Sequence, residues 1–310
     1  HREMIQRFDS SEEICEKIIT IAINSISKSL NLEKNETYLI SYNASNWKLT
    51  EIQELTLDFL KIENVESFKL QDLSGKEVSY QLLEKTDMKK FISEIDVLPD
   101  WIEIRRFKIA LELKNVSPLG FSIIKVIKNS DKAINFNSDL IVKANKAIAN
   151  SFVELFVENN IVKAKNLITN ETYNLNTFET SGDAGDEYNY SPPKEDLLVQ
   201  AIIKNYSIYS NTDYSITLKI DYELEYSSNL NDDRISQNTE KVLNKINSYI
   251  TIKANDPIIY FKTTINNVSK DHRLIANFSS ALNNNLTCTY DTQFGLLEKE
   301  VKVNDSPYDM

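Results

Sequence analysis

The chain has 310 residues and few of the side chains on which most catalytic and metal centres depend. It contains two histidines, His1 and His272, and two cysteines, Cys15 and Cys288, and each pair is far apart in the sequence. Two such cysteines provide neither a disulfide framework nor a thiolate zinc site. Two histidines leave little for a histidine-based metal centre or a catalytic triad. Composition therefore excludes most catalytic chemistries.

Basic charge and long apolar runs are also scarce. There are 35 Lys and Arg against 46 Asp and Glu, which gives a formal net charge of −11, and no dense basic cluster occurs. This balance argues against nucleic acid or an anionic membrane as the main partner. No stretch approaches the roughly 18 consecutive apolar residues that span a bilayer. Glycine is scarce as well, with five residues, whereas asparagine is abundant, with 34.

The first thirty residues predict a helix. Ile14, Ile18 and Ile21 recur at helical spacing, and Ser10 followed by Glu13 has the spacing of a capping box. A single helix with an apolar face does not fold alone, so it needs a partner to pack on. The chain begins inside this helical pattern and not at a methionine. We therefore expect the partner helices to precede the first residue, so that this chain is a fragment.

From residue 38 onward the hydrophobic period changes from helical to two. Apolar and polar residues alternate in segments 55–59, 107–113 and 216–226. Strict alternation of this kind is typical of antiparallel strands with one wet face, and many such strands without intervening helices favour sandwiches over parallel sheets. The fold class is therefore predicted to be mainly β, with antiparallel β-sandwich domains after an N-terminal helix. We place a domain boundary near residue 145.

One segment, residues 180–193, stands out by composition. It holds two of the five glycines, three carboxylates, two tyrosines and a final Pro-Pro pair. Gly182 and Gly185 allow backbone conformations closed to other residues, so the segment predicts a shaped loop and not a simple connector. Carboxylates beside aromatic rings commonly bind sugars, because the carboxylates accept from hydroxyls while a ring covers the C–H face.

Other interpretations of this segment remain. Asp183, Asp186 and Glu187 offer hard oxygen ligands for calcium, although their spacing differs from a helix-loop-helix calcium motif. The segment is also compatible with a plain acidic surface turn. We reject Asp183 and Asp186 as a glycosidase pair, because adjacent loop residues usually diverge and nothing in the sequence supplies the raised pKa that a general acid needs.

The 182–193 segment, GDAGDEYNYSPP, resembles the signature loop of bacterial α-mannosidases of glycoside hydrolase family 38. Segment 38–50 is similar to a strand and turn of that family, with Ala44 in place of a proline and Lys48 in place of the usual glutamate. Segment 267–274 resembles a later strand, with Ile275 in place of its last arginine. Further similar segments fall in the family's order and spread the resemblance over nearly all of the chain: 1–7, 119–121 and 292–298.

The resemblance implies a middle-to-C-terminal portion of such an enzyme. Residues 1–32 would be the end of a helical bundle, 33–145 a small β domain and 146–310 a larger β-sandwich domain. In this family the zinc ligands and the aspartate nucleophile belong to an N-terminal α/β barrel and the start of the bundle, which would lie before His1. The resemblance thus implies no catalytic residue, no metal ligand and no cofactor in this chain, and zinc in the full-length enzyme.

Three residues of the loop are the candidates for substrate binding: Tyr188, Asp186 and Asp183. In relatives a tyrosine of the signature loop reaches the catalytic pocket, and Tyr188 matches its position; the alternative is that Tyr188 only packs at a domain interface. The two aspartates would bind a sugar hydroxyl or hold the loop by accepting backbone N–H bonds. For His272 and Arg273 a polar network between strands is favoured over binding.

The resulting hypothesis is the non-catalytic β-sandwich part of a retaining zinc-dependent α-mannosidase, inactive by itself. The alternative is a free-standing carbohydrate-binding β-sandwich module, and an oligomerisation scaffold is a third hypothesis. The expected partners are an α-mannoside and the missing catalytic barrel, with a homodimer left open and with neither nucleic acid nor membrane. The expected location is the bacterial cytoplasm.

Overall fold

The computed structural model describes residues 2–33, 35–93, 98–130, 138–186, 188–280 and 287–300. The chain forms two compact units, His1–Phe136 and Asn137–Met310. The boundary expected at residue 145 lies inside the second unit, because β7 (Ile141–Val142) pairs with β8 (Ile148–Ala149).

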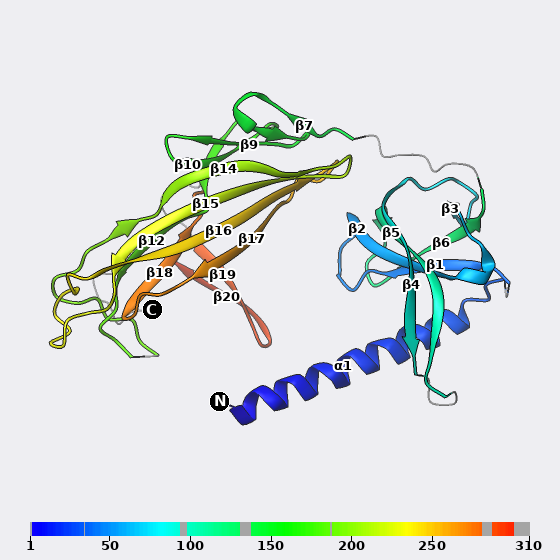
Figure 1. Ribbon diagram of the computed structural model, residues 1–310, viewed down its shortest axis with the longest axis horizontal. Coiled ribbons are helices and arrows are strands. Elements are labelled where there is room, and N and C mark those ends of the chain that lie inside the picture. Colours follow the sequence, from blue (N-terminus) through cyan, green and yellow to red (C-terminus); the bar gives the residue numbers. More distant parts are fainter. Residues whose placement is uncertain are drawn as a thin grey trace. The chain divides into compact units, whose positions relative to one another are not determined.

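The N-terminal helix α1 spans Arg2–Ser29 (Figure 1). It runs without interruption through Ser10, so the predicted capping box is wrong; the neighbouring Ser11 hydroxyl instead donates to the carbonyl of Arg7 at 2.9 Å. None of its residues is buried, and Ile14 and Ile18 are about 60% exposed. Helical periodicity of the sequence was therefore sufficient to predict this element, although its apolar face is uncovered among the described residues.

Among its described residues, the first unit contains two three-stranded antiparallel sheets. In one sheet the central strand pairs with a neighbour on each side in the order β1 (Thr37–Tyr42), β6 (Phe121–Lys128), β3 (Phe68–Asp72). In the other the order is β2 (Leu49–Leu60), β5 (Asp100–Val116), β4 (Tyr80–Ile92), with the short 3-10 helix η1 (Lys61–Glu63) directly after β2.

Aromatic side chains form the centre of this unit's core. Phe68 stacks on Tyr80 at 4.8 Å between ring centroids and meets Phe107 edge-on at 5.2 Å. The Tyr80 hydroxyl donates to the carbonyl of Phe68 at 2.7 Å, and burial raises the pKa of Tyr80 to about 12. The alternation predicted in segment 107–113 is confirmed, because every second residue from Phe107 to Leu113 is fully buried within β5.

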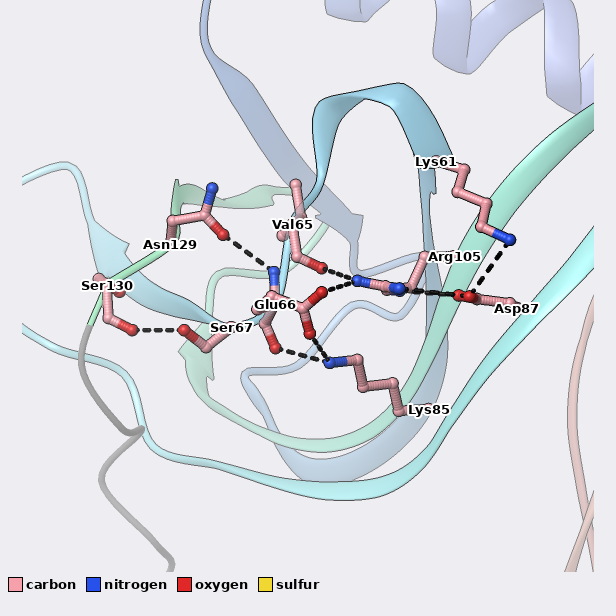
Figure 2. Close-up of polar contacts among 9 residues, drawn as sticks. All are labelled: Lys61, Val65, Glu66, Ser67, Lys85, Asp87, Arg105, Asn129 and Ser130. Carbon is pink, nitrogen blue, oxygen red and sulfur yellow. Dashed lines mark hydrogen bonds and ion pairs between the residues drawn. The ribbon is translucent and has the colours of Figure 1, made fainter.

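An ion-pair network links the approach to β3 with β4 and β5 (Figure 2). Arg105 on β5 donates through Nε to Asp87 on β4 at 2.7 Å and also pairs with Glu66. Lys85 reaches the Glu66 carboxylate at 2.6 Å, and Lys61 approaches Asp87 at 3.5 Å. These cations lower the pKa of both carboxylates. All five groups are paired, so the network serves the structure of this unit.

The described part of the second unit contains four antiparallel sheets. Its long strands lie side by side in the order β14 (Ile202–Asn211), β15 (Ser215–Ser227), β16 (Lys241–Lys253), β17 (Ile259–Asn266) (Figure 1). A five-stranded sheet has the order β11 (Thr172–Leu175), β10 (Ile161–Asn166), β9 (Val153–Glu158), β8, β7, with the short helix η2 (Ala144–Lys146) between the last two. A three-stranded sheet has the order β13 (Val199–Gln200), β12 (Thr177–Gly182), β18 (His272–Asn277), and β19 (Thr287–Thr292) forms a hairpin with β20 (Gly295–Glu300).

The core of this unit lies between the long sheet and the two sheets that face it. Leu155, Val162 and Phe178 join one cluster with Leu218 and Ile250 of β15 and β16. The prediction for segment 216–226 is confirmed, since all six alternating apolar residues of β15 are buried. The predicted fold class, antiparallel β-sandwich architecture after an N-terminal helix, is therefore confirmed.

In the tight turns of this protein, asparagine occupies the left-handed positions that glycine usually occupies in other proteins. Among the described residues, nine of the thirteen non-glycine residues with positive φ are asparagines. The side chain of asparagine tolerates the left-handed conformation because it is short and bonds locally. Asn159 and Asn160, for example, form the turn between β9 and β10, with φ of 51° and 62°. A sequence with five glycines can thus still build many hairpins.

Candidate functional site

The 182–193 loop leaves the end of β12 and returns toward β13. It is described except for Glu187, so the calcium hypothesis that included Glu187 lies partly outside the described residues. Asp183 N–H donates to the carbonyl of Asp271 at 2.9 Å, which continues the pairing of β12 with β18. Ala184 N–H donates to the carbonyl of Ser191 at 2.7 Å and closes the loop on itself. The loop is therefore shaped, as its composition predicts.

Both glycines of the loop are required by close approach of other atoms. A Cβ on Gly185 would lie 1.8 Å from the carbonyl oxygen of Asn189. A Cβ on Gly182 would lie 2.7 Å from a ring carbon of Pro193 and 2.8 Å from the amide nitrogen of Gln237. Any side chain at Gly185 would collide with backbone, which cannot move without reshaping the loop.

The two aspartates accept hydrogen bonds from the loop's own backbone. Asp183 Oδ1 accepts from Gly185 N–H at 2.9 Å and Ser191 N–H at 3.1 Å. Asp186 Oδ1 accepts from Tyr188 N–H and Asn189 N–H, both at 2.9 Å, and these bonds lower the pKa of Asp186. Each aspartate therefore uses one oxygen to hold the turn.

The two tyrosines of the loop lie in different surroundings. Tyr188 is 83% exposed. Tyr190 is held, because its hydroxyl lies 3.3 Å from the Ser181 hydroxyl and the Arg273 guanidinium lies 4.5 Å from its ring centroid. Tyr188 thus projects a phenol from a loop in which its own N–H and that of Asn189 are bonded to Asp186.

Arg234, from the connection between β15 and β16, holds the loop from outside. Its guanidinium donates to the carbonyls of Asp183, Ala184 and Gly185 at 3.2–3.4 Å, and it pairs with the Asp271 carboxylate at 3.4 Å. One guanidinium that binds three consecutive carbonyls holds this stretch of backbone in a single conformation. Nothing in the local sequence around Arg234 indicates this role.

A second anchor lies at the base of the loop. Asp196 Oδ1 accepts from Gly182 N–H at 2.7 Å and from the Gln237 amide at 2.6 Å. The same Gln237 amide donates to the Tyr226 hydroxyl at 3.0 Å. Burial raises the pKa of Tyr226, which keeps its hydroxyl protonated as part of this network. The loop base is therefore connected to the buried end of β15.

His272 occupies the strand directly beside the loop. Its Nδ1 shares a hydrogen bond with the Thr180 hydroxyl at 2.7 Å, and its Nε2 shares one with the Asn267 side chain at 2.9 Å. Burial lowers the pKa of His272, although Asp271 opposes the shift. The favoured inter-strand polar role matches these contacts.

The described residues do not fit a zinc ion. No group of three or more His, Cys, Asp or Glu side chains among them is arranged to hold a metal, and both ring nitrogens of His272 are already engaged. The other histidine, His1, lies outside the described residues.

The three predicted site residues lie on one loop, where Asp183 is half-buried and Asp186 and Tyr188 are exposed. Sequence reasoning missed the residues that hold this loop from elsewhere, Arg234, Asp196 and Gln237. Arg234 and Gln237 follow the loop by some 40 residues in the sequence. They come close to it because β15 pairs with β16 and the connection between these strands lies at the loop.

The fold and the site thus define this chain as an antiparallel β-sandwich protein with an anchored loop that carries an exposed tyrosine. Solved structures with this fold exist. One is an α-mannosidase from Enterococcus faecalis V583, with a TM-score of 0.82 and 19% sequence identity over 98% of this chain and 38% of that chain. Another is a protein in glycosyl hydrolase family 38 from Enterococcus faecalis, with a TM-score of 0.79 and 18% identity over 97% of this chain and 40% of that chain.

At this identity the likeness establishes the fold alone. The chain spans about two fifths of the length of these structures (38% and 40%). No family model and no curated protein matches the sequence. Among the described residues, no helix combines the length and apolarity needed to cross a membrane.

Proposed function

We propose that this chain is the non-catalytic β-sandwich portion of a retaining, zinc-dependent α-mannosidase of glycoside hydrolase family 38. The observation that carries the proposal is the fold: nearly the whole chain superposes on about two fifths of an α-mannosidase. The nucleophile and the zinc ligands are proposed to lie in a part of the polypeptide outside this chain. The coverage of only about two fifths of the matched structures and the shortage of histidine in the sequence support this division.

In this proposal the 182–193 loop contributes Tyr188 to the substrate pocket of the full-length enzyme. The Tyr188 phenol can exchange hydrogen bonds with a sugar hydroxyl, while its ring excludes water from one side of the sugar. The exposure of Tyr188 and the hydrogen bond of its N–H to Asp186 support the role, because a held backbone reduces the ordering cost on binding.

Asp183 and Asp186 have two tasks in this proposal. Their Oδ1 atoms hold the loop, and the free oxygen of exposed Asp186 is available to a sugar hydroxyl beside Tyr188. A carboxylate bond to a hydroxyl is charge-assisted, so even one such contact adds to substrate affinity. Asp183 is less exposed, and its contribution is mainly to position the loop.

The division of labour is tested on the 310-residue chain and on the parent polypeptide, by zinc analysis and by hydrolysis of an aryl α-mannoside. The chain alone is expected to bind no stoichiometric zinc and to cleave no aryl α-mannoside. The parent polypeptide is expected to bind zinc and to hydrolyse the substrate with retention of the anomeric configuration. Zinc there would hold the sugar hydroxyls and stabilise developing charge. Hydrolysis by the purified chain would refute the proposal, and so would a parent polypeptide without mannosidase activity. If the parent is inactive and the chain binds sugar, a free-standing binding module is favoured.

The role of Tyr188 is tested by Tyr188→Phe in the parent enzyme. Removal of one hydrogen bond to the sugar is expected to lower kcat/KM by about tenfold, because a bond of about 1.4 kcal/mol corresponds to that factor. Thermal stability should not change, since the side chain is 83% exposed. Tyr290→Phe, at a half-exposed tyrosine on β19, is the matched control. A kinetically silent Tyr188→Phe would show that this hydroxyl does not contact the substrate.

A further inference from the structure

A polar cleft of about 510 Å³ lies in the second unit, in a part of the sandwich that the proposed function does not use. Its lining includes the β9–β10 turn, the start of β12, the end of β13 and the segment that follows β18. A volume of this size falls in the range of small-molecule pockets. The 182–193 loop does not line it.

Four polar side chains share one face of the three-stranded sheet at this cleft. Thr177 and Glu179 are two residues apart on β12 and therefore point to the same side. Asn277 on β18 is the direct partner of Thr177, and Gln200 on β13 is the direct partner of Glu179. Direct cross-strand partners lie on the same face, so these two pairs place a hydroxyl, a carboxylate and two carboxamides together. All four line the cleft.

The walls of the cleft are fixed by hydrogen bonds between segments far apart in sequence. Asn174 N–H donates to the Ser279 hydroxyl at 2.6 Å, and Ser279 N–H returns a bond to the Asn174 carbonyl at 2.8 Å. Asn160 Oδ1 accepts from Ile203 N–H at 2.9 Å and holds the β9–β10 turn against β14. These bonds use backbone atoms of Asn174, which itself lines the cleft. The site is therefore preorganised before any ligand arrives.

The chemistry of the lining selects a class of ligand. Among the described residues that line it there are five carboxamide side chains and one carboxylate, and none is Lys, Arg or His. An anion would meet the Glu179 carboxylate without a compensating cation, and one carboxylate is too few for a bare metal ion. Carboxamides both donate and accept, which matches hydroxyl groups that do the same. Half-exposed Phe278, which packs edge-on against Phe261 at 5.1 Å, adds an aromatic surface for C–H groups.

We propose that this cleft is a carbohydrate-binding site for a neutral sugar unit, separate from the site that the 182–193 loop serves. Glu179 and Asn277 make the central hydrogen bonds to hydroxyls, Gln200 and Asn174 extend them, and Phe278 covers one edge of the ring. The inference goes beyond the proposed function and does not depend on it, because a protein without mannosidase activity could still bind sugar here.

The test is a titration of the isotope-labelled 310-residue chain with methyl α-mannoside, mannobiose, maltose and cellobiose, followed by NMR of side-chain amide and backbone signals. At least one of these neutral saccharides is expected to shift signals of Gln200, Asn277 and their strand neighbours. Inorganic phosphate is expected to shift none of them. A weak sugar site has a dissociation constant of about 1 mM. If none of the four saccharides shifts these signals at 50-fold that concentration, the proposal is overturned.

Two substitutions locate the binding. Glu179→Gln keeps the side-chain volume but removes the charge, and Asn277→Ala removes a carboxamide; each is expected to weaken binding about tenfold, the factor that corresponds to one hydrogen bond. Asn205→Ala, at an exposed asparagine of β14 outside the lining, is the matched control and should bind as the unaltered chain does. Binding that resists both Glu179→Gln and Asn277→Ala would show that the sugar sits elsewhere and would overturn the proposal.

Discussion

Gly185→Ala tests how rigidly the 182–193 loop holds Tyr188. The new Cβ would lie 1.8 Å from the carbonyl oxygen of Asn189, whereas ordinary contact begins at 3.4 Å. The carbonyl must therefore move by about 1.6 Å, the difference between these distances. Asn189 N–H is bonded to Asp186 Oδ1, and the Ala184–Ser191 bond closes the same turn. A shift of this size breaks both.

The energetic cost follows from those bonds. Each net hydrogen bond contributes about 0.5–1.5 kcal/mol, so the loss of two costs about 1–3 kcal/mol of local stability. That cost corresponds to about 5- to 150-fold faster amide exchange within the loop. The effect should be confined to the loop, because the buried strands of the long sheet do not depend on these bonds. Local exchange is the suitable readout, since a chain of two units has no single free energy of unfolding.

Hydrogen–deuterium exchange of the peptide that covers residues 182–193 measures this effect. Gly295→Ala is the matched control, because a Cβ there meets nothing within 4 Å and its φ is not left-handed. In the parent enzyme Gly185→Ala should lower kcat/KM at least as far as Tyr188→Phe does, with the thermal midpoint nearly unchanged. Exchange and activity that both equal those of Gly295→Ala would refute the view that close packing at Gly185 fixes the loop.

Two further predictions concern pH. Arg106 and Lys90 lower the pKa of Asp58 to about 2, so this pairing stabilises the first unit above the ordinary carboxyl pKa of 3.8 and is lost as pH falls toward 2. Asp58→Asn should cost about 1–2 kcal/mol at pH 7 and flatten the acid limb of the urea midpoint; an unchanged limb would contradict this. Burial lowers the pKa of His272, so below pH 6.5 the unfolded chain binds more protons and the second unit loses stability as pH falls from there. His272→Gln should remove that dependence between pH 7 and 5 in thermal melts, and persistence of the slope would assign it to another group.

Local sequence patterns were sufficient to predict the helix and strands that have one face in solvent. In β15 the alternation of apolar and polar residues predicts the burial of the six apolar side chains from Ile216 to Tyr226, because the period of a strand is a property of neighbouring residues; Thr217, on the other face, is also buried. The helix α1 was predicted for the same reason. Its start was not, because the Ser10–Glu13 spacing satisfies the capping pattern inside a helix that begins at Arg2.

The candidate loop shows the same division. Two glycines among carboxylates and tyrosines predict a shaped loop, and the structure gives the reason at Gly185. The contact of Arg234 with three loop carbonyls has no local signal, since an arginine in a connection between strands is usually a solvated surface residue. Such partners are visible only once β15 and β16 are paired.

The amino-acid sequence alone was enough to establish a mainly antiparallel β protein with an N-terminal helix, a shortage of metal-binding side chains and an unusual loop at 182–193. Each of these follows from composition or from spacing between neighbours in the chain. The tertiary structure alone decided which residues hold the loop and that Glu179 and Gln200 meet Thr177 and Asn277 in one cleft. The cleft depends on the register between strands nearly 100 residues apart. That register is set by the packing of many buried side chains at once, which no local pattern contains.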